Sequence, residues 1–219
     1  MNDKTALLLG ATGLVGSECL KRLVTDDYYS RIIVLTRRAL TDAVGSPKIE
    51  SHVIDFDRIS DYRDLLKASH VFCTLGSTIR QAGSKEQFYK VDFTYVHDIA
   101  GICAGQRTEH FLVVSAMGAN ARSGIFYNRV KGELEKALQQ LPFKSLSIFR
   151  PSLILGDRKE YRLKEEISKL AAGIFTFAIP GKYKPVEASD IAKAMLTIAH
   201  ASLAGFRIYE SDEIQKMAR

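Results

Sequence analysis

Three glycines, separated by two residues each, connect a short apolar segment near the N-terminus to an amphipathic one. The apolar segment Thr5–Leu9 is followed by Gly10-Ala11-Thr12-Gly13-Leu14-Val15-Gly16, and the periodicity predicts a helix over Gly13–Val24. In such a turn one glycine permits the sharp bend after the strand, another lets backbone N–H groups approach a phosphate, and a third lets the helix pack closely on the strand. The segment therefore predicts a site for the pyrophosphate of a dinucleotide at the positive end of the helix.

The glycine spacing, G-x-x-G-x-x-G rather than G-x-G-x-x-G, leaves a purely structural turn as the alternative interpretation. A second apolar run, Ile32–Thr36, follows the helix as a βαβ unit requires, and this context favours the binding site. The residues expected to contact the cofactor here are Gly10, Thr12, Gly13, Leu14 and Val15.

Apolar segments of strand length alternate with segments of helical periodicity along the chain. The predicted strands are Thr5–Leu9, Ile32–Thr36, Glu50–Ile54, His70–Thr74, His110–Ser115 and Ser145–Arg150, with a last one near Phe206–Tyr209. The predicted helices are Gly13–Val24, Tyr62–Lys67, Glu86–Gln106, Phe126–Gln140, Tyr161–Ala172 and Ala188–Ala201. This alternation predicts the α/β class, with a doubly wound parallel sheet and helices on both faces.

Length and composition set the outer limits of the interpretation. With 219 residues, 46% of them hydrophobic, the chain suits a single domain over 1–219, in which about 151–219 forms a small C-terminal substrate cap. The three cysteines are scattered, so no zinc site, other metal site or disulfide framework is indicated.

The net charge of +6 is spread along the chain without a nucleic-acid-binding motif, so we expect a small-molecule substrate and no nucleic acid. No apolar stretch approaches the ~20 residues that cross a bilayer and no signal-peptide pattern is present, so we expect no membrane span and a cytoplasmic location.

Two arginines follow the second predicted strand. Folds that prefer NAD commonly place an acidic residue there for the ribose hydroxyls, whereas a guanidinium group binds the 2′-phosphate of NADP. Arg37 and Arg38 therefore favour NADP(H), with NAD(H) as the other candidate, although surface arginines at a strand end are common. Asp55 and Phe56, after the third predicted strand, are placed to meet the adenine, or are only a loop acid and a core aromatic.

Small residues follow the fourth predicted strand. Leu75, Gly76 and Ser77 would let the cofactor backbone pass across the edge of the sheet at its topological switch point. Small residues also end strands where no ligand binds, so this segment supports the site only together with the glycine turn.

A serine, a tyrosine and a lysine follow the fifth predicted strand. Tyr127 and Lys131, four residues apart, share one face of the helix predicted there. A free phenol is a poor base at neutral pH, but a nearby ammonium group favours the phenolate. Ser115 would then bind a substrate carbonyl or alcohol oxygen, Tyr127 would transfer the proton, and Lys131 would also bind the nicotinamide ribose. The alternative is a surface tyrosine and lysine with a capping serine.

Together these motifs resemble the short-chain dehydrogenase/reductase superfamily: Gly10-x-x-Gly13-x-x-Gly16, Ser115, Tyr127-x-x-x-Lys131 and Arg150-Pro151. More narrowly, Leu75 to Ser84 is similar to the atypical branch that contains the human Tat-interacting-protein-type oxidoreductases. The resemblance implies a Rossmann-type domain with NADPH along the strand ends and Pro151 near the nicotinamide. Asp92 departs from the extended sugar-nucleotide epimerases, which usually show asparagine at this position.

Three functions remain open at this point. The first is an NADP(H)-dependent oxidoreductase that acts on an unidentified small molecule through Ser115, Tyr127 and Lys131. The second is an NADPH-binding redox-sensing or regulatory scaffold with little turnover, as the resemblance to the atypical branch suggests. The third, a nucleotide-sugar epimerase, is least favoured because the C-terminal part is short. The helices Glu86–Gln106 and Phe126–Gln140 offer a homodimer or protein-partner contact, or are simply solvated.

Overall fold

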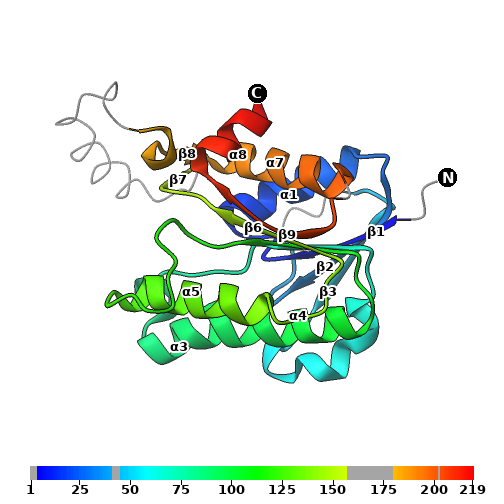
Figure 1. Cartoon of the computed structure of the whole chain (residues 1–219). Helices are drawn as coiled ribbons and strands as arrows, with labels where there is room; N and C mark the ends of the chain where they lie inside the picture. Colours follow the sequence, from blue (N-terminus) through cyan, green and yellow to red (C-terminus); the bar gives the residue numbers. More distant parts are fainter. Residues whose placement is uncertain (1–3, 41–44, 157–179, 202) are drawn as a thin grey trace.

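Seven parallel strands form the central sheet, in the order β3-β2-β1-β4-β5-β6-β9 (Figure 1). The structure is a computed structural model that describes residues 4–40, 45–156, 180–201 and 203–219. The strands are β1 (Lys4–Leu9), β2 (Tyr29–Thr36), β3 (Ile49–Val53), β4 (His70–Cys73), β5 (His110–Val114), β6 (Ser145–Arg150) and β9 (Gly205–Glu210). The strand order reverses between β1 and β4, which is the topological switch of a doubly wound sheet, and the predicted fold class is confirmed.

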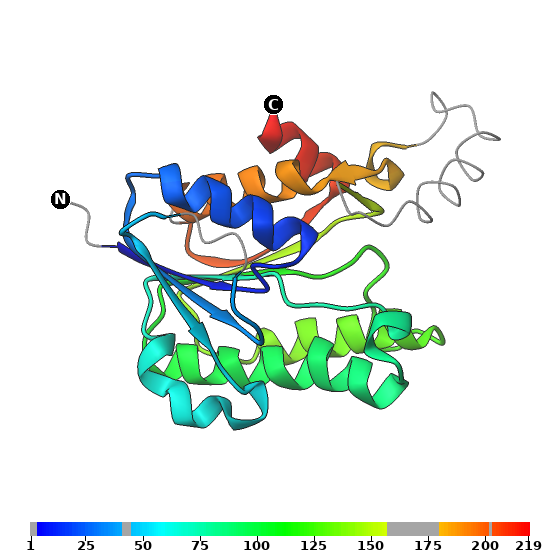
Figure 2. The ribbon, with the colours of Figure 1, turned by 180° about the vertical axis from the view of Figure 1, so that it is seen from behind.

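Helices cover both faces of the sheet (Figures 1 and 2). One face carries α1 (Leu14–Thr25), α7 (Ala188–Ala201) and α8 (Ser211–Ala218), and the other carries the 3-10 helix η1 (Phe56–Leu66), α4 (Tyr95–Gly105) and α5 (Phe126–Leu138). Because side chains alternate along a strand, β1 contributes Leu8 to one apolar core and Leu7 to the other. The consecutive apolar residues of the sequence are thus explained by burial on both faces.

The predicted helix Glu86–Gln106 is confirmed as a continuous helical run that contains one irregular turn. After the short α2 (Ile79–Ala82), the chain forms α3 (Lys85–Tyr89), the π-helical turn η2 (Lys90–Thr94) and then α4. A π-helical turn holds more residues than an α-helical one, so it shifts the helix face that follows it. Here the turn contains Asp92, whose exposed fraction is 0%. Where the sequence predicts a helix over Tyr62–Lys67, the structure has the earlier and longer 3-10 helix η1, whose backbone is non-helical at Arg58 and Tyr62.

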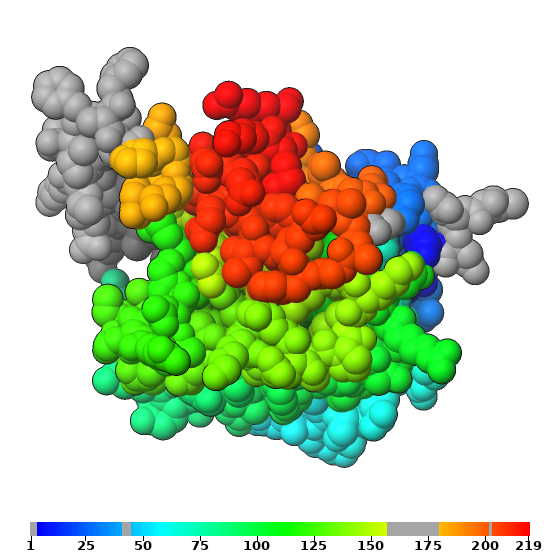
Figure 3. All heavy atoms as spheres, in the orientation of Figure 1, coloured from blue at the N-terminus to red at the C-terminus, as the bar shows by residue number. Residues whose placement is uncertain are grey.

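The C-terminal part supplies elements to the main layers. The strand predicted near Phe206–Tyr209 is β9, which pairs with β6, and the predicted helix Ala188–Ala201 is α7, which packs beside α1. Smaller elements precede them: β7 (Ile154–Leu155) pairs with β8 (Val186–Glu187), and the 3-10 helix η4 (Gly181–Tyr183) lies beside α8. In the space-filling view α7, β9 and α8, coloured orange and red, lie over the upper part of the molecule (Figure 3). The predicted helix Tyr161–Ala172 lies outside the described residues.

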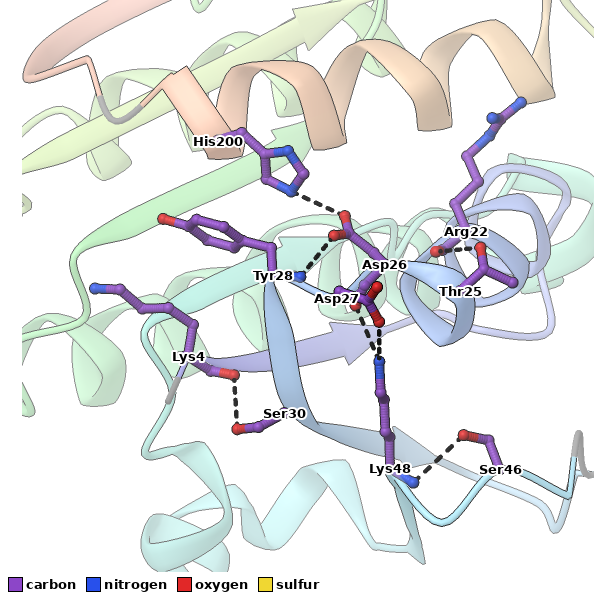
Figure 4. A network of polar contacts seen from close by, with 10 residues as sticks. All are labelled: Lys4, Arg22, Thr25, Asp26, Asp27, Tyr28, Ser30, Ser46, Lys48 and His200. Carbon is purple, nitrogen blue, oxygen red and sulfur yellow. Dashed lines mark hydrogen bonds and ion pairs between the residues drawn. The ribbon is translucent and has the colours of Figure 1, made fainter. Parts of the chain in front are cut away.

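A polar network ties the end of α1 to the end of α7 (Figure 4). One carboxylate oxygen of Asp26 accepts a hydrogen bond from the backbone N–H of Tyr28 at 2.9 Å, and the other lies 2.8 Å from Nε2 of His200. These contacts lie where β2 begins, at the amino-terminal edge of the sheet. Within the described residues, no helix is both long and apolar enough to cross a bilayer.

Candidate functional site

A pocket of about 470 Å³ opens at the carboxyl ends of β1, β2 and β4, beside the topological switch. In open α/β sheets this is the position where ligands bind. Its lining includes Gly10, Thr12, Gly13, Arg37, Arg38, Phe56, Leu75, Gly76 and Ser77 from the predicted cofactor residues, together with Gln81, Val91 and Tyr95. Segments that are distant in sequence therefore meet where the sequence predicts one site.

The glycine turn leaves room for nothing but glycine at two of its positions. Gly10 has φ of +83°, and a Cβ atom there would lie 2.7 Å from the carbonyl oxygen of Thr74. A Cβ atom on Gly16 would lie 2.0 Å from the carbonyl oxygen of Gly10. The backbones of β1, β4 and α1 can approach each other only because these side chains are absent.

The first turn of α1 has an uncompensated positive end. Gly13 is its N-cap, no side chain caps it, and the turn contains no acidic residue. Leu14 and Val15 do not line the pocket, since Val15 is buried in the core and Leu14 packs against that same core. Only their backbone N–H groups are oriented by the helix toward its N-terminal end.

Arg37 and Arg38 line the pocket at the end of β2 and are exposed. Neither forms an ion pair with any of the residues that the structure describes. Two guanidinium groups at the mouth of one pocket, without acidic partners in the described ranges, provide a site for an anion such as a phosphate.

The two residues predicted to meet the adenine have different positions. Phe56 is buried and lines the pocket, with its ring centroid 5.6 Å from that of Tyr95. Asp55 does not line the pocket, because its carboxylate caps η1 by accepting a hydrogen bond from the N–H of Asp57 at 2.9 Å. Tyr95, which the sequence analysis missed, donates its hydroxyl proton to Asp57 at 2.8 Å.

Behind the pocket wall, Asp92 connects the loop after β4 to Lys131. One oxygen of Asp92 accepts bonds from the N–H (2.9 Å) and the hydroxyl (2.7 Å) of Ser77. The other oxygen lies 2.7 Å from Nζ of Lys131. A Cβ atom on Gly76 would lie 3.3 Å from this carboxylate and 3.5 Å from Nζ of Lys131, so the loop passes directly over the ion pair.

Tyr127 and Lys131 share one face of α5, as predicted. The exposed fraction of Lys131 is 3%, and this burial lowers the pKa of its ammonium group. The negative charge of Asp92 and, after it, that of ionised Tyr127 raise the pKa by more than burial lowers it. Tyr127 is half-buried, with its ring centroid 5.4 Å from that of Phe88, and its hydroxyl bonds to none of the described residues.

Ser115 is joined to a different residue of the same helix. Its hydroxyl donates to Oε1 of Glu135 at 2.5 Å, and no bond within the described part of the chain joins it to Tyr127 or Lys131. Glu135 is buried and accepts bonds from Nε of Arg150 at 3.0 and 3.2 Å. Glu135 lies four residues beyond Lys131, so the i+4 spacing places both on one face of the helix. Nothing in the sequence pattern indicates that Ser115 bonds to Glu135.

Pro151 does not line the pocket either. It is buried after β6, and its carbonyl oxygen accepts a bond from the N–H of Met117 at 2.9 Å. Among the described residues, no group of three His, Cys, Asp or Glu side chains is placed to hold a metal ion.

The sequence matches a family profile described as NAD(P)H-binding over residues 10–145. It is 32% identical to "Protein HTATIP2" of Rattus norvegicus, over 93% of this chain and 81% of that protein. It is 31% identical to "Protein FMP52, mitochondrial" of Candida albicans, over 92% and 90% of the two chains. Other FMP52 relatives are also named as mitochondrial. The prediction of a cytoplasmic location is contradicted by these FMP52 relatives, whose names point to mitochondria.

Solved structures show the same fold at low sequence identity. An oxidoreductase of the short-chain dehydrogenase/reductase family from Burkholderia thailandensis superposes with a TM-score of 0.74 at 17% identity, covering 99% of this chain and 94% of that one. MoeE5 in complex with UDP-glucose and NAD gives a TM-score of 0.72 at 16% identity, covering 98% and 80%. Likeness at this identity shows the fold alone. The sequence matches show that the chain belongs to the NAD(P)H-binding family, with HTATIP2 and FMP52 among its relatives, and the solved structures show that it shares their Rossmann-type fold.

Proposed function

We propose that this protein is an NADP(H)-dependent oxidoreductase that interconverts a carbonyl group and an alcohol on a small molecule. The observation that carries the proposal is the pocket at the switch between β1 and β4. Its wall combines the glycine turn, the loop above Lys131 and two arginines that meet no acidic partner among the described residues. Family membership supports a nicotinamide dinucleotide as the ligand.

The residues present fit such a ligand. Gly10 and Gly16 keep side chains out of the turn, and the uncapped first turn of α1 offers N–H groups to the pyrophosphate. Phe56 and Tyr95 supply an apolar surface for a base, while Arg37 and Arg38 would bind the 2′-phosphate and so favour NADP(H) over NAD(H).

A bound nicotinamide dinucleotide supplies or accepts the hydride. In the reducing direction the hydroxyl of Tyr127 donates its proton to the substrate oxygen, and in the oxidising direction its phenolate accepts one. The ammonium group of Lys131, on the same face of α5, would bind the nicotinamide ribose. The proton of Ser115 is directed toward Glu135, so the serine oxygen is free to accept a bond from a substrate hydroxyl.

Turnover with a panel of aldehydes, ketones and alcohols tests this proposal through oxidation of NADPH or reduction of NADP⁺. We expect Tyr127→Phe to reduce kcat by at least about a hundredfold, the usual contribution of a general acid–base group, while NADPH affinity stays unchanged. Tyr62→Phe, which removes a hydroxyl from η1, is the matched control. A Tyr127→Phe variant as active as the wild type would overturn the catalytic assignment.

A second candidate function is an NADPH-binding regulatory protein with little turnover. The observation that favours it is that the Ser115 hydroxyl is bonded to Glu135 rather than directed toward Tyr127. In that case the wild-type protein would bind NADPH, would turn over none of the panel, and would bind a protein partner with an affinity that depends on the nucleotide.

A further inference from the structure

Asp92 carries three polar contacts from two separate segments of the chain. Ser77 contributes its N–H and its hydroxyl to one oxygen, and Lys131 contributes its ammonium group to the other. The side chain of Asp92 is fully buried and that of Lys131 is 4% exposed. A buried charge is tolerated when a partner and hydrogen bonds replace the lost water. Here Oδ2 accepts both hydrogen bonds, whereas Oδ1 accepts none from the described residues and depends on the charge of Lys131.

The contacts depend on local backbone features. Asp92 lies in the π-helical turn η2, the irregular segment between α3 and α4. Opposite it, Gly76 lacks the side chain that would press on the carboxylate and on Nζ of Lys131. The π-helical turn and this glycine therefore allow the carboxylate, the loop and the lysine to meet directly behind the pocket wall.

We propose that Asp92 is the positioning residue of the dinucleotide site. One carboxylate oxygen holds the ammonium group of Lys131 and the other holds the backbone of the Gly76–Ser77 loop, so the lysine and the loop are preassembled for the cofactor. This inference rests on the proposed function, because it assigns the preassembled unit to nicotinamide dinucleotide binding.

The charge of Asp92 has a consequence that packing alone does not have. Asparagine at position 92 could still accept both bonds from Ser77, but it would leave a buried ammonium group without an anion. Because burial disfavours the charged form, the pKa of Lys131 should then fall below its ordinary value. A residue that only filled space would leave the titration of Lys131 unchanged.

Two measurements on Asp92→Asn test the proposal. The first is an NMR titration of Lys131 in the ligand-free protein, with lysine side chains labelled at Cε and the signal assigned by its loss in Lys131→Met. The second is the Kd for NADPH from nucleotide fluorescence. We expect the Lys131 midpoint to fall below that of an exposed lysine and the Kd to rise about tenfold, the effect of disturbing one charge-assisted contact. Asp98→Asn, an exposed aspartate of α4, is the matched control and should change neither quantity.

A double-mutant cycle separates positioning from general destabilisation. If Asp92 acts through Lys131, Asp92→Asn combined with Lys131→Met should bind NADPH as Lys131→Met alone does, because the effects of coupled residues do not add. The double variant also removes both buried charges, so it serves as the test if Asp92→Asn alone fails to fold. Ser77→Ala, which removes only the hydroxyl bond, should leave the Lys131 titration unchanged.

The outcomes are distinguishable. An unchanged Lys131 midpoint with wild-type NADPH affinity in Asp92→Asn would overturn the proposal, and so would additive losses of affinity in the cycle. If the wild-type protein bound neither NADPH nor NADH, the proposed function would fail. The Lys131 titration, which needs no nucleotide, would still decide whether Asp92 controls the lysine.

Discussion

At the scale of single residues, buried polar groups are the features whose effects can be measured one at a time. His70 and His110 lie at the amino-terminal edge of the sheet, far along their strands from the pocket. Nδ1 of His70 is 2.8 Å from the hydroxyl of Tyr29, and Nε2 of His110 is 2.8 Å from the hydroxyl of Ser147. Burial lowers the pKa of each histidine from 6.5 to about 4, so both rings are neutral in the folded protein at pH 7.

These histidines should make the protein sensitive to acid. The unfolded chain binds protons near pH 6.5 and the folded one only near pH 4, so stability is full above pH 6.5 and falls as the pH decreases toward 4. By pH 5 each histidine should remove about 2 kcal/mol from the free energy of unfolding. Urea unfolding of the wild type and of His110→Gln at pH 7.5 and pH 5 measures this, and an equal loss in both proteins would contradict it.

Glu135 is the second residue with a measurable role. It accepts the hydroxyl proton of Ser115 and pairs with Arg150, which also contacts Glu210. Glu135→Ala leaves a guanidinium group and a buried hydroxyl without their main acceptor, so it should reduce the free energy of unfolding by about 3 kcal/mol. Glu18→Ala, which breaks only an exposed pair with Lys21, should cost less than about 1 kcal/mol in the same chemical denaturation experiment. An equal loss of free energy of unfolding in the two variants would contradict the larger contribution expected of the buried network.

At the scale of elements, helices and strands with a strong local sequence signal are predicted, and irregular or short ones are not. The strand Ser145–Arg150 and the helix Ala188–Ala201 are predicted with the observed bounds, because continuous apolar runs and helical periodicity are local signals. The π-helical turn at Asp92 was missed, because one irregular turn barely alters the periodicity of a long segment. The short α8 was also missed, although Glu210 and Glu213 form a reciprocal cap at its start.

In the candidate site, too, local patterns were predicted and tertiary contacts were not. The glycine turn and the Tyr127–Lys131 pair are local patterns. The glycine turn lines the pocket and Lys131 lies just behind its wall, whereas Tyr127 is not among the described residues that line it. The bonds from Asp92 to Lys131 and from Ser115 to Glu135 join residues on different elements, and a single sequence holds no signal for such pairs. Local sequence patterns therefore predict these residues but not the tertiary contacts that join them.

The turn between β1 and α1 gives a prediction at the element scale. A Cβ atom at Gly16 would clash with the carbonyl oxygen of Gly10, so Gly16→Ala should separate α1 from the sheet and reduce both thermal stability and NADPH binding. Gly101→Ala in α4 meets no atom within 4 Å and should be neutral or stabilising by up to about 1 kcal/mol, because alanine favours a helix. Thermal unfolding of both variants checks this, and a Gly16→Ala variant as stable as Gly101→Ala would contradict the close approach.

At the scale of the whole molecule, the doubly wound sheet determines where function can be located. The carboxyl ends of β1, β2 and β4 converge on the pocket. Lys131 lies behind its wall and belongs to α5, which covers the face of the sheet opposite to α1 (Figure 1). The opposite edge of the sheet carries the contacts of Asp26 with Tyr28 and His200, which join two helices of one layer (Figure 4). The pocket and the contacts that anchor these helices therefore lie at opposite edges of the same sheet.

Calorimetric titration with NADPH and NADH tests the central claim most directly. The account predicts that NADPH binds more tightly, and that Arg37→Ala weakens NADPH binding at least about tenfold through loss of a charge-assisted bond while changing NADH binding little. Arg31→Ala, within β2 and paired with Glu50, is the control and should bind both nucleotides as the wild type does. Binding of neither nucleotide by the wild-type protein, or equal weakening of both by Arg37→Ala, would contradict the assignment of this pocket to NADP(H).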